Sequence, residues 1–545
     1  MTFNIKKRDG PGRTGELEIG GKTVVTPNIF FINTERFKAP DFADLTISNK
    51  KDLLKLEHLF IVENAKQLFQ KPEEFVEKTV ELEEKEAYNK AIFLPSVAEP
   101  VSLSLLVYLG IDLFDSTPAI ISARNNELFF TNEKINKNSL KELPCSCPVC
   151  SKYKGKPSEM SFNEILKHNY YILIDEIKKI RNAIHNNQLR NLVESRIVNS
   201  PHLTSILRNL NMKHYSFLEK HTPLVSNSTI PVISKDSFNR PEIKRFQERV
   251  IKRYKKPVST KILLLLPCSA KKPYSFSKSH KLFREKLMLS GNPNVVHELI
   301  ITSPIGIVPR ELELVYPASS YDIPVTGIWD EDEKKMIREL LTSYLKNNRY
   351  DKTIAHLPNN IMEFIRDLLT DPIETCIDKP TSKKSLEKLS TVLKENASNY
   401  EKIKQQTRNF ENIKTIAMYQ FTIDVAEKLL KNSTIKGKYP QYRIMHNKTQ
   451  LGMLVKEKGM ITLTLQGGER IASTGKYYVE IYDDFTLKGT LFAPGVKDAD
   501  PDIRPGDEVV ILQNKKTYAV GVAMMNGEEM KKTLKGIAVK TRHHL

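Results

Sequence analysis

A short apolar run that ends in a cysteine constrains this chain more than any other feature. Ile262–Leu266 is uninterrupted by polar residues and is followed at once by Pro267 and Cys268. Such a run is typical of a strand that is buried on both faces of a parallel sheet. A buried parallel strand presents the residues after it at the carboxyl edge of the sheet, where α/β enzymes place reactive groups. Cys268 is therefore a candidate nucleophile.

The loop after Cys268 is basic and rich in hydroxyl groups. Lys271, Lys272 and His280 are close to the thiol in sequence. We expect these groups to lower the pKa of Cys268 from its usual value of roughly 8.5. Lys272 and Ser275 could alternatively bind a phosphate, and His280 could begin a helix. A core cysteine that merely follows a strand is the alternative for Cys268.

Two further apolar runs indicate a parallel sheet around this strand. His297–Thr302 and Thr353–Leu357 are each followed by polar loops and helical patterns. Strands that alternate with helices are typical of parallel sheets with helices on both faces. The sequence therefore predicts a doubly wound parallel α/β core domain over residues 257–375.

A polar block follows the second of these runs in the same strand-then-loop order. Arg310 and Asp322 lie in this block. We interpret both as candidate substrate-binding residues, because loops after parallel strands meet at one edge of the sheet. A salt-bridged loop is the alternative.

A tight cysteine cluster predicts a metal site. Cys145, Cys147 and Cys150 lie within six residues of one another and are followed by His168. Three thiolates and one imidazole match closed tetrahedral zinc. Because four protein ligands leave no open position, we expect a structural rather than a catalytic metal. His185 is an alternative fourth ligand.

The charge of the chain favours a polyanionic partner. The sequence has 84 Lys and Arg against 65 Asp and Glu, a formal net charge of +19. An excess of this size favours nucleic acid, although a lysine-rich surface without a partner is the alternative. Lys235–Lys256 is predicted to be a basic helix that either follows phosphates or is a solvated linker.

The number of cysteines and the hydropathy of the sequence indicate where in the cell the protein is located. Five cysteines in 545 residues do not make a disulfide framework, and the metal cluster suits a reducing cytosol. We have no role for Cys376 and expect it in a core. The amino terminus lacks the apolar core of a signal peptide, and the stretch Pro100–Ile111 is too short to span a bilayer. These features predict a soluble cytoplasmic protein.

The first 200 residues are predicted to form an α/β unit. Strand-like runs occur at Val24–Ile32 and Ala91–Leu94, and an apolar segment covers Leu103–Phe114. Asn169–Leu192 has helical spacing of its apolar residues. Alternation of strands and helices is typical of α/β folds.

The carboxy-terminal part changes character. Residues 376–410 are rich in Lys, Ser, Glu and Asn, which predicts an exposed helical connector. The strand-like runs Tyr477–Ile481 and Val509–Leu512 flank a turn at Ile503–Asp507 that contains Pro and Gly. Short strands with regular turns predict a small β-barrel at the end of the chain.

Together these blocks resemble the archaeosine synthase family, archaeal tRNA-modifying enzymes related to tRNA-guanine transglycosylases. The resemblance covers nearly the whole chain. The segments similar to the family signature are Pro267-Cys268, Lys272–Ser275 and Ser279-His280; those similar to the transglycosylase-like domain are Arg8–Arg13, Asp112–Ser116, the cysteine cluster and His168-Asn169; and those similar to a PUA domain, a small RNA-binding barrel, are Phe492–Val496, Gly506-Asp507 and Gly521.

The resemblance implies a multidomain α/β and α+β architecture. The expected domains are a transglycosylase-like domain with a zinc-binding subdomain at 1–200, the catalytic α/β core at 257–375, a small α/β domain at 410–470 and a PUA domain at 471–545. A complete TIM barrel takes about 250 residues, so a partial barrel is expected at the amino terminus. Asp115 would then be a remnant of a base-binding pocket.

The resemblance also implies a reaction. The family acts on 7-cyano-7-deazaguanine in the D-loop of tRNA, which implies addition of an amine to the nitrile. Lysine is the expected donor, with glutamine or ammonia as alternatives; a radical-SAM partner enzyme and a homodimer are also expected. Cys268 could add to the nitrile to form a thioimidate, with Lys272 or His280 supplying protons. Direct attack by the amine is the alternative.

Two other functions compete with this interpretation. Base exchange by a tRNA-guanine transglycosylase needs two acidic residues, and Asp115 matches the position of the nucleophile. The Ser-Asp-Ser-Gly-Gly segment that carries the second acid is absent from the sequence. A non-enzymatic RNA-binding protein would explain the charge and the tail, but it would leave the Cys268 loop unexplained.

Overall fold

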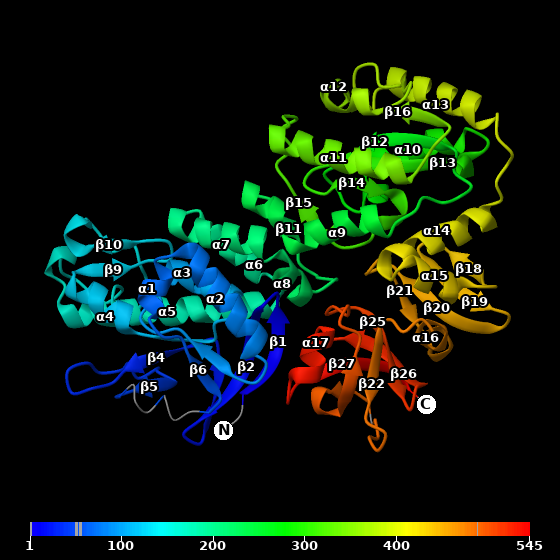
Figure 1. The fold of residues 1–545 in the computed structure, drawn as a ribbon. Helices are drawn as coiled ribbons and strands as arrows, with labels where there is room; N and C mark the ends of the chain where they lie inside the picture. Colours follow the sequence, from blue (N-terminus) through cyan, green and yellow to red (C-terminus); the bar gives the residue numbers. More distant parts are fainter. Residues whose placement is uncertain (1–2, 50–52, 54–56, 488, 545) are drawn as a thin grey trace. The chain divides into compact units, whose positions relative to one another are not determined.

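The computed structural model describes residues 3–49, 53, 57–487 and 489–544. The chain forms two compact units, and most of their helices and strands are labelled in Figure 1. Unit 1 comprises residues 1–223, 491–496 and 525–538, and unit 2 comprises 224–490, 497–524 and 539–545. Each unit is described by itself.

The centre of unit 1 is a five-stranded parallel sheet in the order β5-β4-β8-β7-β6. Its strands are β4 (Asn28–Ile32), β5 (Leu45–Ile47), β6 (Leu59–Ile61), β7 (Ala91–Phe93) and β8 (Leu113–Asp115). The principal helices of the unit are α2 (Pro72–Lys85), α3 (Pro100–Tyr108), α4 (Thr117–Arg124), α5 (Phe162–His185), α6 (Leu189–Ile197), α7 (Pro201–Lys213) and α8 (Tyr215–His221).

The two faces of this sheet are covered differently. Ile29 and Phe31 of β4 pack with the helices, in one core with Leu173 of α5. Phe30 points the other way and packs with Leu17 of an antiparallel meander. That meander consists of β1 (Phe3–Asp9), β2 (Gly12–Ile19) and β3 (Lys22–Thr26). The alternation of side chains along each strand is therefore what holds the layers together.

Two elements expected in unit 1 are interrupted. The run Val24–Ile32 is not one strand, because β3 ends at Thr26 and β4 begins at Asn28. Pro27 lies between them and cannot donate to a sheet ladder. The helix expected over Asn169–Leu192 ends at His185, and α6 begins at Leu189 after a left-handed residue at Asn187.

A buried ion pair joins the meander of unit 1 to its sheet. Arg13 of β2 donates from Nε to Asp112 Oδ1 at 2.9 Å and from Nη2 to Asp112 Oδ2 at 2.6 Å. Asp112 Oδ2 also accepts from the backbone N–H of Ile92 at 2.8 Å. Both side chains are inaccessible to solvent, so neither charge can be hydrated if its partner is lost.

The centre of unit 2 is a five-stranded sheet in the order β14-β13-β12-β16-β17. The strands are β12 (Ile262–Pro267), β13 (Val296–Thr302), β14 (Gly306–Pro309), β16 (Lys352–Ala355) and β17 (Ile373–Glu374). All neighbouring pairs are parallel except β13 with β14. Helices α9 (Pro241–Lys252), α10 (Lys278–Met288), α11 (Glu331–Asn347), α12 (Asn359–Ile365) and α13 (Lys383–Ala397) surround it.

Strand β12 is buried on both faces. Leu264 packs with Phe283 of α10 and Leu389 of α13 on one face. Leu263 packs on the other face, in the core that includes Phe246 of α9 and Leu341 of α11. The uninterrupted apolar run of the sequence reflects this double burial.

Three expectations for unit 2 need correction. Residues 376–410 are not simply an exposed connector, because α13 buries Leu386, Leu389 and Leu393 against the sheet. Cys376 is partly exposed rather than in a core. The basic segment Lys235–Lys256 contains a short 3-10 helix followed by α9, which buries Phe246 and Arg249, so this helix is not a solvated linker.

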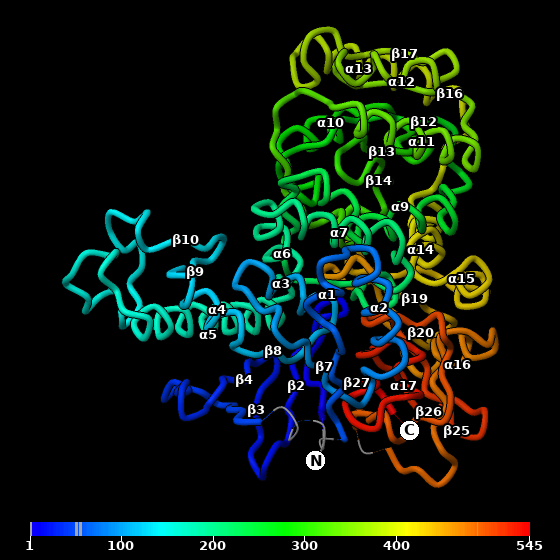
Figure 2. Tube along the Cα trace, turned by 60° about the vertical axis from the view of Figure 1, so that its left-hand side comes forward, coloured from blue at the N-terminus to red at the C-terminus, as the bar shows by residue number. Residues whose placement is uncertain are grey.

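Unit 2 also contains the short parallel pair of β11 (Ile230–Pro231) and β15 (Tyr321–Asp322), a four-stranded sheet and most of a six-stranded sheet. The four-stranded sheet contains β18 (Thr434–Lys438), β19 (Gln441–His446), β20 (Thr449–Val455) and β21 (Met460–Leu463), all antiparallel, and packs with α14 (Gln405–Gln420), α15 (Ile423–Leu430) and α16 (Leu465–Ala472). The six-stranded sheet includes β22 (Tyr478–Ile481), β25 (Glu508–Gln513), β26 (Lys516–Ala523) and β27 (Ile537–His544). Figure 2 traces the same elements from a second direction.

Within residues 3–49, 53, 57–487 and 489–544, no helix combines the length and apolar character needed to cross a bilayer.

The buried ion pair of unit 1 gives a stability prediction. Asp112→Ala should lower the free energy of unfolding of unit 1 by about 3–5 kcal/mol, because buried Arg13 then loses the carboxylate that accepts two of its hydrogen bonds, and the remaining carboxylate, Glu83, is 3.9 Å away. Urea denaturation followed by circular dichroism measures this change. Asp175→Ala, which removes an exposed partner of Lys179, should have little effect. Equal effects of the two substitutions would contradict the assignment.

Candidate functional site

Cys268 lies at the carboxyl end of β12, as the first residue after the strand. Its backbone N–H donates to Ile301 of the neighbouring β13 at 3.1 Å. The thiol packs against the core of unit 2 but is partly exposed. The sheet therefore presents Cys268 at its edge, where a substrate can approach.

Three buried hydroxyl groups lie beside Cys268. The hydroxyls of Tyr274 and Tyr321 are 2.7 Å apart, and that of Tyr321 also hydrogen-bonds to Thr302 at the end of β13. All three side chains are buried. The Thr302 hydroxyl acts on the Cys268 thiol by hydrogen bonding and favours the thiolate. The cluster links the thiol to the two tyrosines.

Lys272 interacts electrostatically with both Cys268 and Asp322. Its ammonium nitrogen is 3.9 Å from the centre of the Tyr321 ring, a cation–π contact that fixes the side chain. Burial lowers the pKa of Lys272, while the charges of Cys268 and Asp322 raise it. The structure thus brings three predicted residues, Cys268, Lys272 and Asp322, into one neighbourhood.

The net effect of the surroundings on Cys268 differs from the expectation. Burial raises the pKa of the Cys268 thiol, and the hydrogen bond from Thr302 and the charge of Lys272 lower it only in part. The expected net lowering is therefore wrong. The reason is desolvation, which penalises the thiolate more than one nearby ammonium stabilises it.

His280 is buried on α10, and both of its ring nitrogens are engaged. Nε2 donates to the carbonyl oxygen of Pro267 at 3.0 Å, and Nδ1 accepts from Arg310 at 2.8 Å. Burial, aided by the charge of Arg310, lowers the pKa of His280 to about 3, so the imidazole is neutral at physiological pH. In this arrangement His280 fixes the carbonyl next to Cys268 and, as a neutral imidazole, does not act as an acid near neutral pH.

Arg310 forms the salt-bridged loop that was the alternative interpretation. Its guanidinium pairs with Glu298 at 2.7 Å and with Glu313 at 2.8 Å. Ser275 joins the same group, because its backbone N–H donates to Glu313 at 2.9 Å. The structure therefore places Ser275, His280 and Arg310 together, in a cluster that is distinct from the neighbourhood of Lys272.

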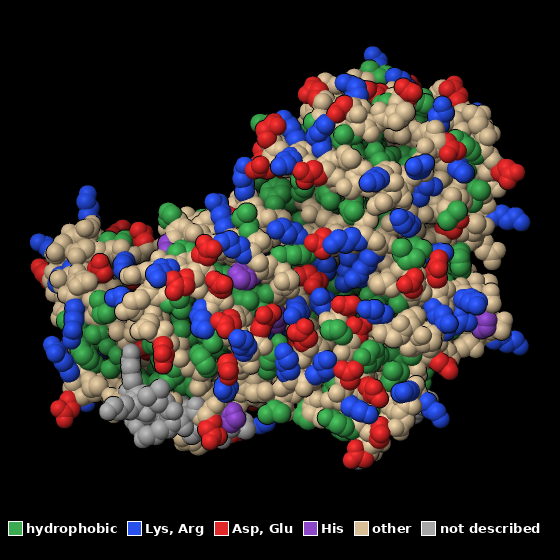
Figure 3. All heavy atoms as spheres, in the orientation of Figure 1, with side chains coloured by type: hydrophobic (Ala, Val, Ile, Leu, Met, Phe, Trp, Pro, Cys, Tyr) green, Lys and Arg blue, Asp and Glu red, His purple; other side chains and the backbone are tan. Residues whose placement is uncertain are grey.

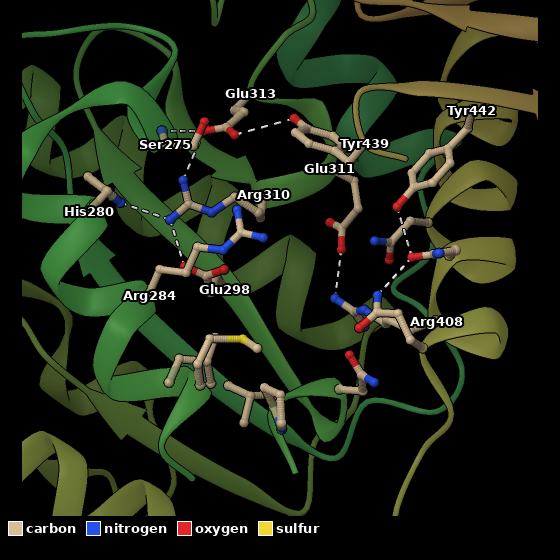
Figure 4. A pocket seen from close by; sticks show the side chains of 18 residues that line it. Ser275, His280, Arg284, Glu298, Arg310, Glu311, Glu313, Arg408, Tyr439 and Tyr442 are labelled. Carbon is tan, nitrogen blue, oxygen red and sulfur yellow. Dashed lines mark hydrogen bonds and ion pairs between the residues drawn. The ribbon is translucent and has the colours of Figure 1, made fainter. Parts of the chain in front are cut away.

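That cluster forms one wall of a cavity of about 160 Å³ within unit 2, which we name the Arg408 pocket. Figure 4 shows its polar lining. The lining residues used below are Ser275, Arg284, Glu298, Arg310, Glu311, Glu313, Arg408, Asn412, Tyr439 and Tyr442. Sequence reasoning missed Arg408 and Asn412, because α14 lies more than a hundred residues from the Cys268 loop and carries no recognisable motif.

The cysteine cluster of unit 1 is assembled as the sequence predicts a metal site to be. One ligand atom each from Cys145, Cys147, Cys150 and His168 lies within 4.8 Å of the others. His168 Nδ1 is 3.5 Å from Cys147 Sγ and 3.2 Å from Cys150 Sγ, while its Nε2 donates to the Phe129 carbonyl at 2.7 Å. Four ligand atoms at these separations can surround one metal ion, and the Phe129 carbonyl fixes the ring that presents Nδ1.

Asp115 ends β8 of unit 1. Its Oδ1 accepts from the backbone N–H groups of Ser96 and Thr117, at 3.1 and 3.0 Å. The side chain is buried. In the structure it therefore orders the loops that follow β7 and β8.

Family models match four consecutive segments of the chain. They are queuine tRNA-ribosyltransferase at 42–202, a domain of unknown function (DUF5591) at 243–393, the patch-forming domain C2 of tRNA-guanine transglycosylase at 411–477 and the PUA domain at 482–545. The second segment contains the Cys268 neighbourhood. These matches, with the fold, define a transglycosylase-like, tRNA-modifying transferase of mixed α/β architecture with a carboxy-terminal PUA domain.

Curated relatives narrow this class. The chain is 36% identical to archaeosine synthase subunit alpha of Methanosarcina acetivorans, over 89% of this chain and 79% of the relative. It is 37% identical to archaeosine synthase of Haloferax volcanii, over 86% and 79% of the two chains. The chain belongs to the archaeosine synthase family, which confirms the resemblance seen in the sequence, and its function is tRNA modification in archaeosine biosynthesis.

The base-exchange alternative is not favoured. A tRNA-guanine(15) transglycosylase of Methanobrevibacter smithii is 27% identical, over 83% of this chain and 66% of the relative.

A crystal structure of a protein of unknown function is 30% identical, covers 55% of this chain and 99% of its own, and has a TM-score of 0.45.

The charges around Cys268 give a prediction about thiol reactivity. The alkylation rate of Cys268 should increase with pH, with a midpoint above the usual thiol range, because burial raises its pKa. Lys272→Met should raise the midpoint further, because the ammonium that favours the thiolate is lost. Mass spectrometry of iodoacetamide-labelled peptides measures both rates. Lys271→Met is the matched control, and an equal shift in that variant would contradict the role of Lys272.

Proposed function

We propose that this chain adds an amine to the nitrile of 7-cyano-7-deazaguanine already installed in the D-loop of tRNA. The observation that carries the proposal is the position of Cys268 at the carboxyl end of β12 with Lys272 beside it. A nitrile carbon is electrophilic but slow to react, and a thiolate is a nucleophile suited to it. Membership of the archaeosine synthase family supports this substrate.

The proposed reaction has two additions and one elimination. The Cys268 sulfur forms a bond to the nitrile carbon, and the nitrile nitrogen takes a proton, which gives a thioimidate. The donor amine then attacks the same carbon, the carbon–sulfur bond breaks, and the proton that the amine nitrogen loses returns to the sulfur and restores the thiol. The product is an amidine, and the atoms of nitrile and amine are all retained. Direct attack by the amine, without the thioimidate, is the competing route.

Lys272 is the proposed proton donor to the nitrile nitrogen. Burial lowers its pKa, which brings the ammonium closer to the range where it can give up a proton near neutral pH. Its charge also favours the thiolate of Cys268 before attack. His280, kept neutral by burial and by the charge of Arg310, is proposed as a positioning residue that its two hydrogen bonds hold in place.

The remaining predicted residues have supporting roles in this proposal. Asp322, close to Lys272, orients the ammonium or the substrate. Arg310 and Ser275 shape the loop behind Cys268. Asp115 belongs to the transglycosylase-like domain and contributes to tRNA placement there. We also propose that the domains predicted from the sequence have separate roles in this reaction. Their bounds are 1–200, 257–375, 410–470 and 471–545.

The tRNA, rather than a small polyanion, accounts for the basic charge. On the face drawn in Figure 3, Lys and Arg side chains are interspersed with Asp and Glu, so charge alone does not outline the binding surface. The PUA match at 482–545 supports contact with RNA through this end of the chain. Lysine is the proposed donor, with glutamine and ammonia as alternatives. We also propose that the chain forms a homodimer and acts together with a radical-SAM partner enzyme.

Zinc is the metal we propose for the cysteine cluster, in a structural role. Each purified chain should hold about one zinc ion, because three thiolates and one imidazole fill a tetrahedral shell. Cys150→Ser should reduce the zinc content well below one equivalent, as measured by inductively coupled plasma mass spectrometry. Cys376→Ser is the matched control. Undiminished zinc in the Cys150 variant would contradict the site.

The reaction is tested with tRNA that carries 7-cyano-7-deazaguanine. The purified chain is offered lysine, glutamine and ammonium separately, and the nucleosides are weighed by mass spectrometry. A mass gain equal to the donor is expected. Cys268→Ala should reduce turnover at least about a hundredfold, because it removes the nucleophile.

Cys376→Ala is the control for this experiment, since Cys376 is a second partly exposed thiol. Near-normal turnover by the Cys268→Ala enzyme would exclude the covalent route and leave direct attack. An unchanged nitrile with all three donors, together with exchange of labelled free base into tRNA, would refute the proposed reaction in favour of base exchange.

A further inference from the structure

The Arg408 pocket contains buried polar atoms that the protein does not satisfy. Among the described residues, Arg408 Nη1, Asn412 Oδ1 and Ser275 Oγ are buried without a hydrogen-bond partner. All three side chains line the pocket. Buried polar groups nearly always have partners, because leaving one unpaired in the interior costs folding free energy. Three such atoms around one cavity indicate a ligand that supplies the missing bonds.

Arg408 is the strongest of these indications. Its side chain comes from α14, and the residue is only 8% exposed. Nη2 donates to Glu311 at 2.8 Å, and this bond fixes the plane of the guanidinium. Nη1 is then held in position with hydrogen atoms to donate. A fixed guanidinium with free donors is suited to a carboxylate.

The other two atoms require a donor from the ligand. Asn412 Oδ1 is an acceptor, and Ser275 Oγ can accept as well as donate. The carboxylates of Glu298 and Glu313 also line the cavity and are held there by Arg310. An ammonium group on the ligand would donate to these acceptors and would lie close to negative charge.

The charge balance of the lining selects against polyanions. Three arginines (Arg284, Arg310 and Arg408) face three glutamates (Glu298, Glu311 and Glu313) around the cavity. A phosphate would bring two negative charges against the glutamates, whereas a zwitterion would add no net charge. Figure 4 shows these groups converging on the same space. A small cavity that combines the unpartnered Nη1 of Arg408 with unpartnered acceptors fits a molecule that carries both charges.

We infer that the Arg408 pocket binds a free α-amino acid, whose carboxylate accepts from Arg408 and whose ammonium donates to Asn412 and Ser275. Binding at this site needs neither tRNA nor turnover, so the inference goes beyond the proposed reaction. Only the further step, in which the bound amino acid is the amine donor, rests on that reaction. Ser275 of the pocket wall lies between Cys268 and α10, and His280 in the first turn of α10 hydrogen-bonds to the Pro267 carbonyl, so occupancy would steady the segment that joins them.

Binding is tested on the full chain without tRNA. Thermal-shift measurements with the proteinogenic α-amino acids identify the best ligand, and calorimetry then gives its affinity. If lysine is that ligand, cadaverine lacks the carboxylate and 6-aminohexanoate lacks the α-ammonium. Each analogue should bind at least about tenfold more weakly, and inorganic phosphate should not compete. No binding by any amino acid up to roughly 10 mM would overturn the inference, as would equal binding of phosphate.

Two variants locate the site. Arg408→Lys keeps a positive charge beside Glu311 but removes the second donor, and it should weaken binding at least about tenfold. Asn412→Leu removes the acceptor at a partly exposed position and should also weaken binding at least about tenfold. This second variant keeps the inference testable if Arg408→Lys does not fold. Arg366→Lys is the matched control, because Arg366 forms an exposed ion pair with Glu374. Unchanged affinity in both pocket variants would overturn the inference even if the enzyme remained active.

Discussion

The double burial of β12 is the constraint on which the candidate chemistry of this protein depends. One face of the strand packs on α10 and α13, and the other packs on the core that contains α9 and α11. Because neither face is exposed, the strand has no freedom to shift its register, and its end is fixed. The position of Cys268 is fixed as well, because Cys268 is the first residue after the strand. The neutral imidazole of His280 reinforces it by holding the carbonyl of Pro267.

Burial fixes the positions of the side chains in the site and also disfavours their charged forms. The same desolvation that fixes Cys268 and Lys272 raises the pKa of the thiol and lowers that of the amine. Burial thus disfavours both the thiolate and the ammonium, while each of these charges favours the other. A pair of this kind is suited to a reaction in which one group attacks while the other delivers a proton.

The sequence was informative where one residue type or a local pattern determines the structure. The apolar run Ile262–Leu266 predicted a buried parallel strand, and the cysteine cluster predicted a four-ligand group, because both depend on neighbours in the chain. The pKa of Cys268 was predicted with the wrong sign, since the count of nearby lysines contains no information about burial. The Arg408 pocket was missed for a related reason: its walls come from segments far apart in the chain.

The ion pair between Arg408 and Glu311 has a consequence for how such a chain can be assembled over evolution. Glu311 belongs to the α/β core and is buried with His297 at 3.1 Å, while Arg408 comes from α14, beyond the helix that closes the core. A core domain that ended before residue 405 would therefore keep Cys268. It would, however, leave the Glu311 carboxylate without the Arg408 guanidinium with which it forms an ion pair. Shuffling of these modules is constrained at this junction, and a transplanted core should carry α14 with it.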